Sequence, residues 1–254
     1  QDHDFKLRLE NDRTDEIGAL TDSFNCMLDR INTLVNQVYQ QELAQKNAEI
    51  EALQAQINPH FLYNTLDPVN WMLIARGEMD ISAVVVALGK LMQYSMDTAR
   101  AMVSLEEEYR NVRDYLMIQK NRLEDRLEFT LELDEPLKCF PVPKLILQPL
   151  VENAIKYGIE PSLQPGHILV RTRKTDDDIQ ILVKDNGCGM DEAQLTFYRR
   201  LLRNDPSGQT NIGVRNVARR LQLHFGGRCG FDVSSRPGDG LSITIRIPAQ
   251  EEQP

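Results

Sequence analysis

The sequence of 254 residues has few cysteines, and neither they nor its histidines are grouped as metal ligands usually are. Its four cysteines form no CxxC pair, and its four histidines form no HxxxH pair. Structural zinc sites use such closely spaced ligands, so we expect none here. Widely separated thiols also favour a reducing compartment over that of a disulfide-stabilised secreted protein.

A long hydrophobic run and an excess of positive charge are also absent from the sequence. The most apolar stretch, residues 81–92, is interrupted by Ser82, Gly89 and Lys90 and is too short to cross a bilayer. Lys and Arg number 29 against 38 Asp and Glu, which gives a formal net charge of −9. Because duplex DNA requires a basic surface, we expect no nucleic-acid partner. The chain has no initiator Met and no secretory hydrophobic segment, so we expect it to be part of a longer polypeptide.

Proline and glycine are scarce in the first half of the chain and frequent in the second, which indicates two regions of different structure. The first region is helical in pattern. The second predicts strands at 127–133, 168–173, 179–184 and 241–247, and helices at 143–158, 191–203 and 213–225. Strands and helices mixed without a regular βαβ repeat predict an α+β or α/β layer with helices on one face of a sheet.

The first region contains an apolar stripe with the spacing of a coiled coil. Intervals of three and four residues separate Ile17, Leu20, Phe24, Met27, Ile31, Leu34 and Val38. The stripe predicts a parallel dimer, and the alternative is one amphipathic helix packed on its own domain. A second helical pattern follows Gly77 and runs towards Ile118. Two such helices form a hairpin, and two hairpins in a dimer form a four-helix bundle.

A histidine follows a predicted kink in the first hairpin helix. Pro59 lacks an N–H and disfavours the helical conformation at Asn58, so the helix should kink just before His60. Helical geometry points His60 away from the apolar stripe that begins at Leu62, and it places Asn64 on the histidine's face. This pattern predicts an exposed imidazole with a polar neighbour. The alternative is an ordinary surface or structural histidine.

The segment 147–157, within the helix predicted at 143–158, carries polar residues that could bind a ligand. Its residues Asn153, Lys156 and Tyr157 are close enough to converge on one ligand. An amide oxygen can bind Mg²⁺, and a lysine ammonium can bind phosphate. The alternative is a solvated polar face of an ordinary helix.

Two glycine-containing segments add to this pattern. Asp185 ends a predicted strand and is followed by Gly187 and Gly189, so a carboxylate could accept from an exocyclic amine where the backbone approaches closely. An ordinary Asx turn is the alternative. Gly213 begins a predicted helix after the polar stretch 204–210, and free N–H groups at a helix start attract phosphate.

In their order and spacing these segments resemble the cytoplasmic part of LytS/YesM-type sensor histidine kinases. Residues 15–25 resemble the second half of a HAMP signal-relay module, and residues 58–64 resemble the phosphoacceptor box. The resemblance implies an α plus α/β fold, with a dimeric coiled coil and four-helix-bundle dimerisation domain followed by a GHKL (Bergerat) α/β sandwich. The expected domains are HAMP and coiled-coil linker at 1–38, phosphotransfer hairpin at 39–125 and ATP-binding domain at 126–254.

The resemblance also implies roles for individual residues. A nitrogen of His60 receives the γ-phosphoryl group of ATP, Asn153 binds Mg²⁺, and Asp185 accepts from the adenine amino group. The other residues implied to bind the nucleotide are Lys156, Tyr157, Gly187, Gly189, Met190, Gly213, Val214 and Gly240, with residues 204–212 as a lid.

Two further residues are candidates for catalysis. Glu152 could help polarise the accepting imidazole, and a purely structural role is its alternative. Asn64 could orient water for dephosphorylation of a response regulator, or it could be a simple surface amide. Pro149 stands where the superfamily's ATPases carry a catalytic Glu, so we expect no fast ATP hydrolysis.

Taken together, the resemblance implies a two-component signalling enzyme. It would act as a homodimer that phosphorylates itself on His60 with Mg-ATP and then passes the phosphoryl group to a response regulator. A membrane sensor segment would precede this chain, which would be the cytoplasmic portion of a membrane-anchored bacterial protein. The alternatives are a non-catalytic ATP-binding relay and an ATPase clamp of the same superfamily.

Overall fold

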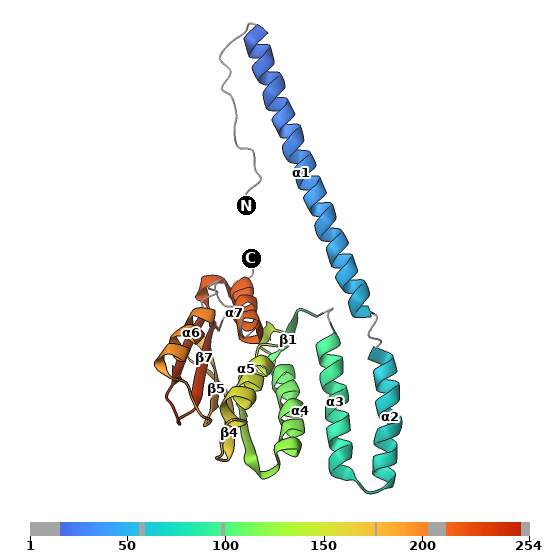
Figure 1. Ribbon diagram of the computed structural model, residues 1–254, viewed down its shortest axis with the longest axis vertical. Coiled ribbons are helices and arrows are strands. Elements are labelled where there is room, and N and C mark those ends of the chain that lie inside the picture. Colours follow the sequence, from blue (N-terminus) through green and yellow to red (C-terminus); the bar gives the residue numbers. More distant parts are fainter. Residues whose placement is uncertain (1–15, 56–58, 98–99, 176, 203–211, 250–254) are drawn as a thin grey trace. The chain divides into compact units, whose positions relative to one another are not determined.

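The computed structural model describes residues 16–55, 59–97, 100–175, 177–202 and 212–249 (Figure 1). The chain divides into two units at residues 58 and 59. The predicted lid and the beginning of the HAMP-like segment lie outside the described residues. Among the described helices, none combines the length and apolar character that a membrane span requires.

The first unit contains one long helix, α1 (Glu16–Ala55), which confirms the helical prediction for this region. Most of the predicted apolar stripe is exposed within the chain, namely Ile17, Leu20, Met27, Ile31, Leu34 and Val38. Phe24 is half-buried. Exposed apolar side chains at coiled-coil spacing form a surface that another helix can cover.

The second unit begins with the predicted helical hairpin. It consists of α2 (Pro59–Ala75) and α3 (Met79–Met96), which lie side by side (Figure 1). Gly77 lies in the turn between them with φ +78°, a conformation that glycine adopts readily. Helix α2 starts at Pro59, because proline is well tolerated at the first helical position, and the predicted kink falls at residues outside the description. His60 follows in the first turn, and the orientation of its side chain lies outside the described residues.

One prediction for the hairpin is wrong: the second helix does not continue from residue 80 to Ile118. Helix α3 ends at Met96, and a short strand, β1 (Met102–Ser104), leads into a separate helix, α4 (Leu105–Leu123). A new helix starts here because Ser104 and Glu107 form a reciprocal capping box. Strand β1 pairs antiparallel with β3 (Pro141–Pro143).

A five-stranded mixed sheet forms the centre of the second unit. Its strands, in spatial order, are β2 (Leu127–Leu133), β4 (Gly166–Lys174), β5 (Asp178–Asp185), β7 (Leu241–Pro248) and β6 (Gly230–Ser235). Strands β2 and β4 are parallel, and the other pairs are antiparallel. The four predicted strands are confirmed, and β6 is an edge strand that the sequence pattern did not indicate.

Alternate residues of the central strands are buried under a layer of helices, which confirms the predicted sheet with helices on one face. The layer contains α4, α5 (Gln148–Asn153), the π-helical segment η3 (Ala154–Ile159), α6 (Glu192–Leu202) and α7 (Ile212–Phe225). Short 3₁₀ turns complete the chain at η1 (Glu124–Arg126), η2 (Glu135–Leu137) and η4 (Gly226–Arg228). The helix predicted at 143–158 therefore begins later than expected, because residues up to Pro143 form β3.

Fully buried aliphatic side chains join the helices to the sheet. Leu116 of α4, Ile155 of η3 and Leu221 of α7 belong to one core with Ile181 and Ile245 of the central strands. Each such side chain contributes roughly 1.5–3 kcal/mol by its removal from water. This core fixes the ends of β5 and β7 against α5 and η3, and the candidate site lies there.

Candidate functional site

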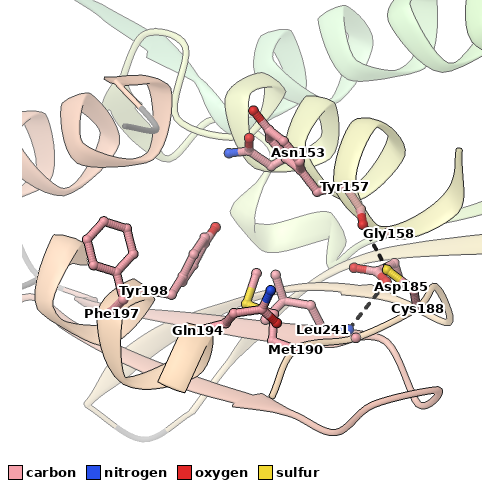
Figure 2. A pocket seen from close by; sticks show the side chains of 11 residues that line it. Asn153, Tyr157, Gly158, Asp185, Cys188, Met190, Gln194, Phe197, Tyr198 and Leu241 are labelled. Carbon is pink, nitrogen blue, oxygen red and sulfur yellow. Dashed lines mark hydrogen bonds between the residues drawn. The ribbon is translucent and has the colours of Figure 1, made fainter. Parts of the chain in front are cut away.

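A cavity of about 280 Å³ opens between the α5–η3 segment, α6 and the ends of β5 and β7 (Figure 2). Five of its lining residues belong to the predicted site: Asn153, Tyr157, Asp185, Gly189 and Met190. The others are Gly158, Cys188, Gln194, Phe197, Tyr198 and Leu241. Asn153 and Tyr157 lie on one side of the cavity, and Met190 and Leu241 lie on the opposite side (Figure 2).

Asp185, the last residue of β5, brings a buried carboxylate to this cavity. Its Oδ1 accepts hydrogen bonds from the backbone N–H groups of Gly187 at 2.8 Å and Leu241 at 3.3 Å. Burial raises the pKa of the Asp185 carboxyl, and these backbone hydrogen bonds oppose the rise. Since both bonds end on Oδ1, the second oxygen, Oδ2, has the capacity to accept a hydrogen bond from an amine of a ligand.

Two predicted glycines are required by close backbone packing around this carboxylate. A Cβ on Gly187 would stand 2.3 Å from the carbonyl carbon of Gly158, and one on Gly240 would stand 2.1 Å from the carbonyl oxygen of Asp185. Gly240 also has φ +77°, which strains any residue with a side chain. Both glycines thus shape the cavity wall without being among its lining residues.

Asn153 ends α5 at the point where the helix widens into η3. Its half-buried amide and the partly exposed ring of Tyr157, one turn later, both line the cavity. Segments of π-helix often occur at functional sites, because the wider turn changes where side chains project. Lys156 is exposed, and its ammonium lies 5.2 Å from the centre of the Tyr157 ring. An amide oxygen and a buried carboxylate that line the same cavity are a set of groups that suits Mg²⁺ and an aminopurine.

Comparisons with known proteins agree with this arrangement. The family described as histidine kinase matches residues 48–127, and the family of histidine kinase-, DNA gyrase B- and HSP90-like ATPases matches residues 142–251. The chain is 41% identical over 246 residues to the sensor histidine kinase YesM of Bacillus subtilis (strain 168), covering 97% of this chain and 41% of that protein. This chain belongs to the YesM/LytS-type histidine kinases.

A second relative is more distant. The sensor protein kinase HptS of Staphylococcus aureus (strain USA300) is 27% identical over 215 residues, covering 85% of this chain and 41% of that protein. The chain therefore spans about two-fifths of the length of the curated relatives that it matches. Its match to the ATPase family implies that the domain at residues 142–251 binds ATP.

The start of α7 packs against the start of α5. A Cβ on Gly213 would lie 3.3 Å from the Cβ of Pro149, and Val214 is fully buried. Neither residue lines the cavity among the described residues, and the predicted lid that precedes them is outside the description. Their part in binding phosphate stays a prediction.

The two candidates for catalysis lie outside the cavity lining. The Oε1 atom of Glu152 accepts from Nε2 of Gln148 at 2.7 Å, and the Oε1 atom of Gln148 accepts from Nδ2 of Asn111 on α4 at 2.6 Å. These bonds connect Glu152 to the α4 side of the domain. Burial, assisted by the charge of Glu152, raises the pKa of Tyr115 on α4 to about 12. Asn64 is exposed on α2, and the catalytic roles of both residues stay predictions.

Helix α6 contributes residues that the sequence analysis missed. Tyr198 is 2% exposed, and its hydroxyl has no hydrogen-bond partner among the residues that the structure describes. Burial raises the pKa of this hydroxyl. In Figure 2 the hydroxyl points towards the side of the cavity where Asn153 lies. Helix α6 was predicted directly after the glycine segment, but nothing in its sequence distinguishes Tyr198 from an ordinary core aromatic.

Proposed function

We propose that this chain transfers the γ-phosphoryl group of ATP to His60. The observation that carries the proposal is the cavity between Asn153 and the buried carboxylate of Asp185. In the same unit, the hairpin helix α2 begins with the Pro59–His60 pair. The proposed recognition contact runs from the adenine amino group to Asp185. Lys156 and the N-terminus of α7 would face the phosphates.

Asn153 would hold Mg²⁺ through its amide oxygen, and the metal would neutralise charge on the phosphate oxygens. In the proposed reaction a nitrogen of neutral His60 forms a bond to the γ-phosphorus as the bond to the bridging β–γ oxygen breaks, and ADP leaves. The residue after His60 is Phe61, so the chain offers no acid directly next to the accepting ring. Neutral imidazole is a sufficient nucleophile near neutral pH, and the work of the protein is positioning.

The proposal includes a homodimer and a response regulator as partners. The exposed stripe on α1 suits a second copy of the same helix. Exposed apolar residues on the hairpin, Trp71, Met72, Met79 and Ile81, suit a bundle formed with the partner's hairpin. A receiver carboxylate of the response regulator would then take the phosphoryl group. Within the full-length protein, we expect this part to be the cytoplasmic portion of a membrane-anchored bacterial sensor.

Labelled ATP tests the proposal directly. The wild-type protein, incubated with Mg²⁺ and ATP labelled at the γ-phosphate, should gain label that is lost in acid and stable in alkali. His60→Gln should remove this label, and the matched control His167→Gln should keep it because His167 lies on the exposed side of β4. Asn153→Asp should strongly reduce it. Unchanged labelling of His60→Gln would exclude His60, and hydrolysis of ATP without labelling would favour the ATPase alternative.

A further inference from the structure

Glu108 on α4 is a fully buried carboxylate with an unusual set of partners. Its oxygens accept from three consecutive backbone N–H groups, those of Leu145 at 2.6 Å, Ile146 at 2.9 Å and Leu147 at 2.9 Å. The hydroxyl of Tyr94 on α3 donates to the same carboxylate. Burial raises the pKa of Glu108, and these hydrogen bonds oppose the rise. A buried carboxylate is costly, so its partners must be held in place.

The three N–H groups belong to the loop 144–147, which leads directly into α5 and so to Asn153. Leu145 has φ +59°, a strained conformation for a residue with a side chain. The guanidinium of Arg220 on α7 donates to the carbonyl of Lys144 at 2.6 Å. The loop is therefore fixed by α4 on one side and by α7 on the other, as a strained segment requires.

The last turn of α3 contacts this loop by a second route. The ammonium of Lys144 donates to the backbone carbonyl of Asp97, the C-cap residue of α3. The same ammonium lies 4.6 Å from the centre of the Tyr94 ring. Lys144 is itself buried, at 7% exposure. Helix α3 packs against α2, the helix that carries His60, so the loop is connected to the phosphoacceptor hairpin.

We propose that Glu108 is a positioning residue that couples the last turn of α3, through the Tyr94 hydroxyl, to the loop 144–147 and hence to Asn153. The role of Asn153 in this coupling rests on the proposed function. Hydrogen bonds from three backbone N–H groups are enough to hold the loop 144–147 in place. The fourth donor, the Tyr94 hydroxyl on the hairpin helix α3, is not needed for that purpose. A shift of α3 that withdraws the Tyr94 hydroxyl leaves a buried carboxylate short of one donor, and the loop must respond.

Amide hydrogen exchange on the full chain tests this coupling. Tyr94→Phe removes only the hydroxyl, and Tyr109→Phe is the matched control because the Tyr109 hydroxyl bonds Glu132 and Thr172 instead. Without nucleotide, Tyr94→Phe should speed exchange at residues 145–153 by about tenfold, and Tyr109→Phe should not. Glu108→Gln, which keeps the shape but loses the charge, should speed exchange at the same residues.

Amide exchange measured with a bound nucleotide analogue distinguishes coupling from a purely structural role of Glu108. Mg²⁺ with the non-hydrolysable analogue AMP-PNP should slow exchange at residues 91–97 of the wild-type protein and of Tyr109→Phe, but not of Tyr94→Phe. Unchanged exchange at 145–153 in nucleotide-free Tyr94→Phe would overturn the coupling, whatever the exchange with AMP-PNP shows. If AMP-PNP protects residues 153–159 of the wild-type protein without affecting residues 91–97, the coupling is overturned and the proposed function stands. If AMP-PNP protects neither segment, the proposed function fails, and the nucleotide-free comparison still decides the coupling.

Discussion

Asp185 and Gly158 are in direct contact at the end of β5: a Cβ on Gly158 would stand 2.7 Å from Oδ1 of Asp185. The carboxylate is thus enclosed by η3 on one side and by its own glycine turn on the other. Enclosure of this kind removes the charge from water, which is why the pKa of Asp185 is raised. The residue proposed to recognise the nucleotide is for the same reason a source of instability in the folded protein.

Asp185→Asn should therefore weaken the binding of ATP without lowering the stability of the folded protein. Since the folded-state pKa is raised, the stability contributed by this carboxyl is present at acidic pH and is lost as the pH rises through that pKa. At neutral pH the ionised carboxylate is unfavourable, whereas Asn keeps an oxygen for the N–H groups of Gly187 and Leu241. We expect an equal or higher unfolding temperature, and a roughly 100-fold weaker affinity for ATP by calorimetry.

The pH dependence of binding provides the control for this prediction. The ATP affinity of the wild-type protein should fall on acidification at a pH above the ordinary range of an Asp, because the protonated Asp185 can no longer serve as the ionised acceptor. The affinity of Asp185→Asn should lack this component. An Asp185→Asn variant that binds ATP as tightly as the wild-type protein would contradict the assignment of Asp185.

Tyr198→Phe should affect the nucleotide more than the fold. Its hydroxyl is buried without a partner in the described structure, so its removal should leave the free energy of unfolding unchanged or raise it by up to about 1 kcal/mol. A nucleotide that supplies the missing partner would bind the variant about fivefold more weakly. Tyr109→Phe, which loses two hydrogen bonds, should instead lower stability by about 1–2 kcal/mol. A comparable loss of stability in Tyr198→Phe would show that its hydroxyl is already bonded.

Gly240 and Gly238 form a matched pair for testing how closely the backbone of Gly240 packs against that of Asp185. Both have positive φ, +77° and +85°, but a Cβ on Gly238 would meet nothing within 4 Å. Gly238→Ala should cost about 1–2 kcal/mol for backbone strain alone. Gly240→Ala should cost at least about 3 kcal/mol, because its Cβ also collides with the backbone of Asp185. Chemical denaturation measures both, and equal costs would contradict the packing described here.

The α1 stripe predicts how the proposed dimer can be weakened. Glu in place of both Ile31 and Leu34 puts charges into the proposed seam, so sedimentation should show a dimer at least about tenfold weaker. Thr33→Glu, at an exposed polar position of the same helix outside the stripe, is the control and should leave the dimer intact. A dimer that is unaffected by the double replacement would show that α1 is not part of the interface.

Much of the second region could be predicted because its patterns are local. Strand β2 has the predicted bounds of 127–133, and α6 and α7 differ from their predicted bounds by about one residue. Strand β6 was missed because a short edge strand beginning at Gly230 alternates weakly. The start of α4 was missed although Ser104 and Glu107 carry the capping-box signal, because apolar residues at helical spacing occur on both sides of it.

Residues of the site could be predicted from the sequence only where they lie in a recognisable motif. Asp185, Asn153 and Tyr157 lie in motifs and do line one cavity. Glu108 stands in a run of three glutamates, a pattern typical of an exposed helix face, and only the tertiary structure shows that it is buried. The unpartnered hydroxyl of Tyr198 also depends on contacts between elements far apart in the sequence.

The position of the phosphoryl group on the protein decides whether His60 accepts it. After incubation with Mg²⁺ and ATP, the protein is digested under alkaline conditions that preserve phosphohistidine, and the modified peptide is sequenced by mass spectrometry. We expect the peptide from α2 to be modified at His60. A phosphoryl group on His167, His224 or a hydroxyl side chain, or none in a protein that binds ATP, would contradict it.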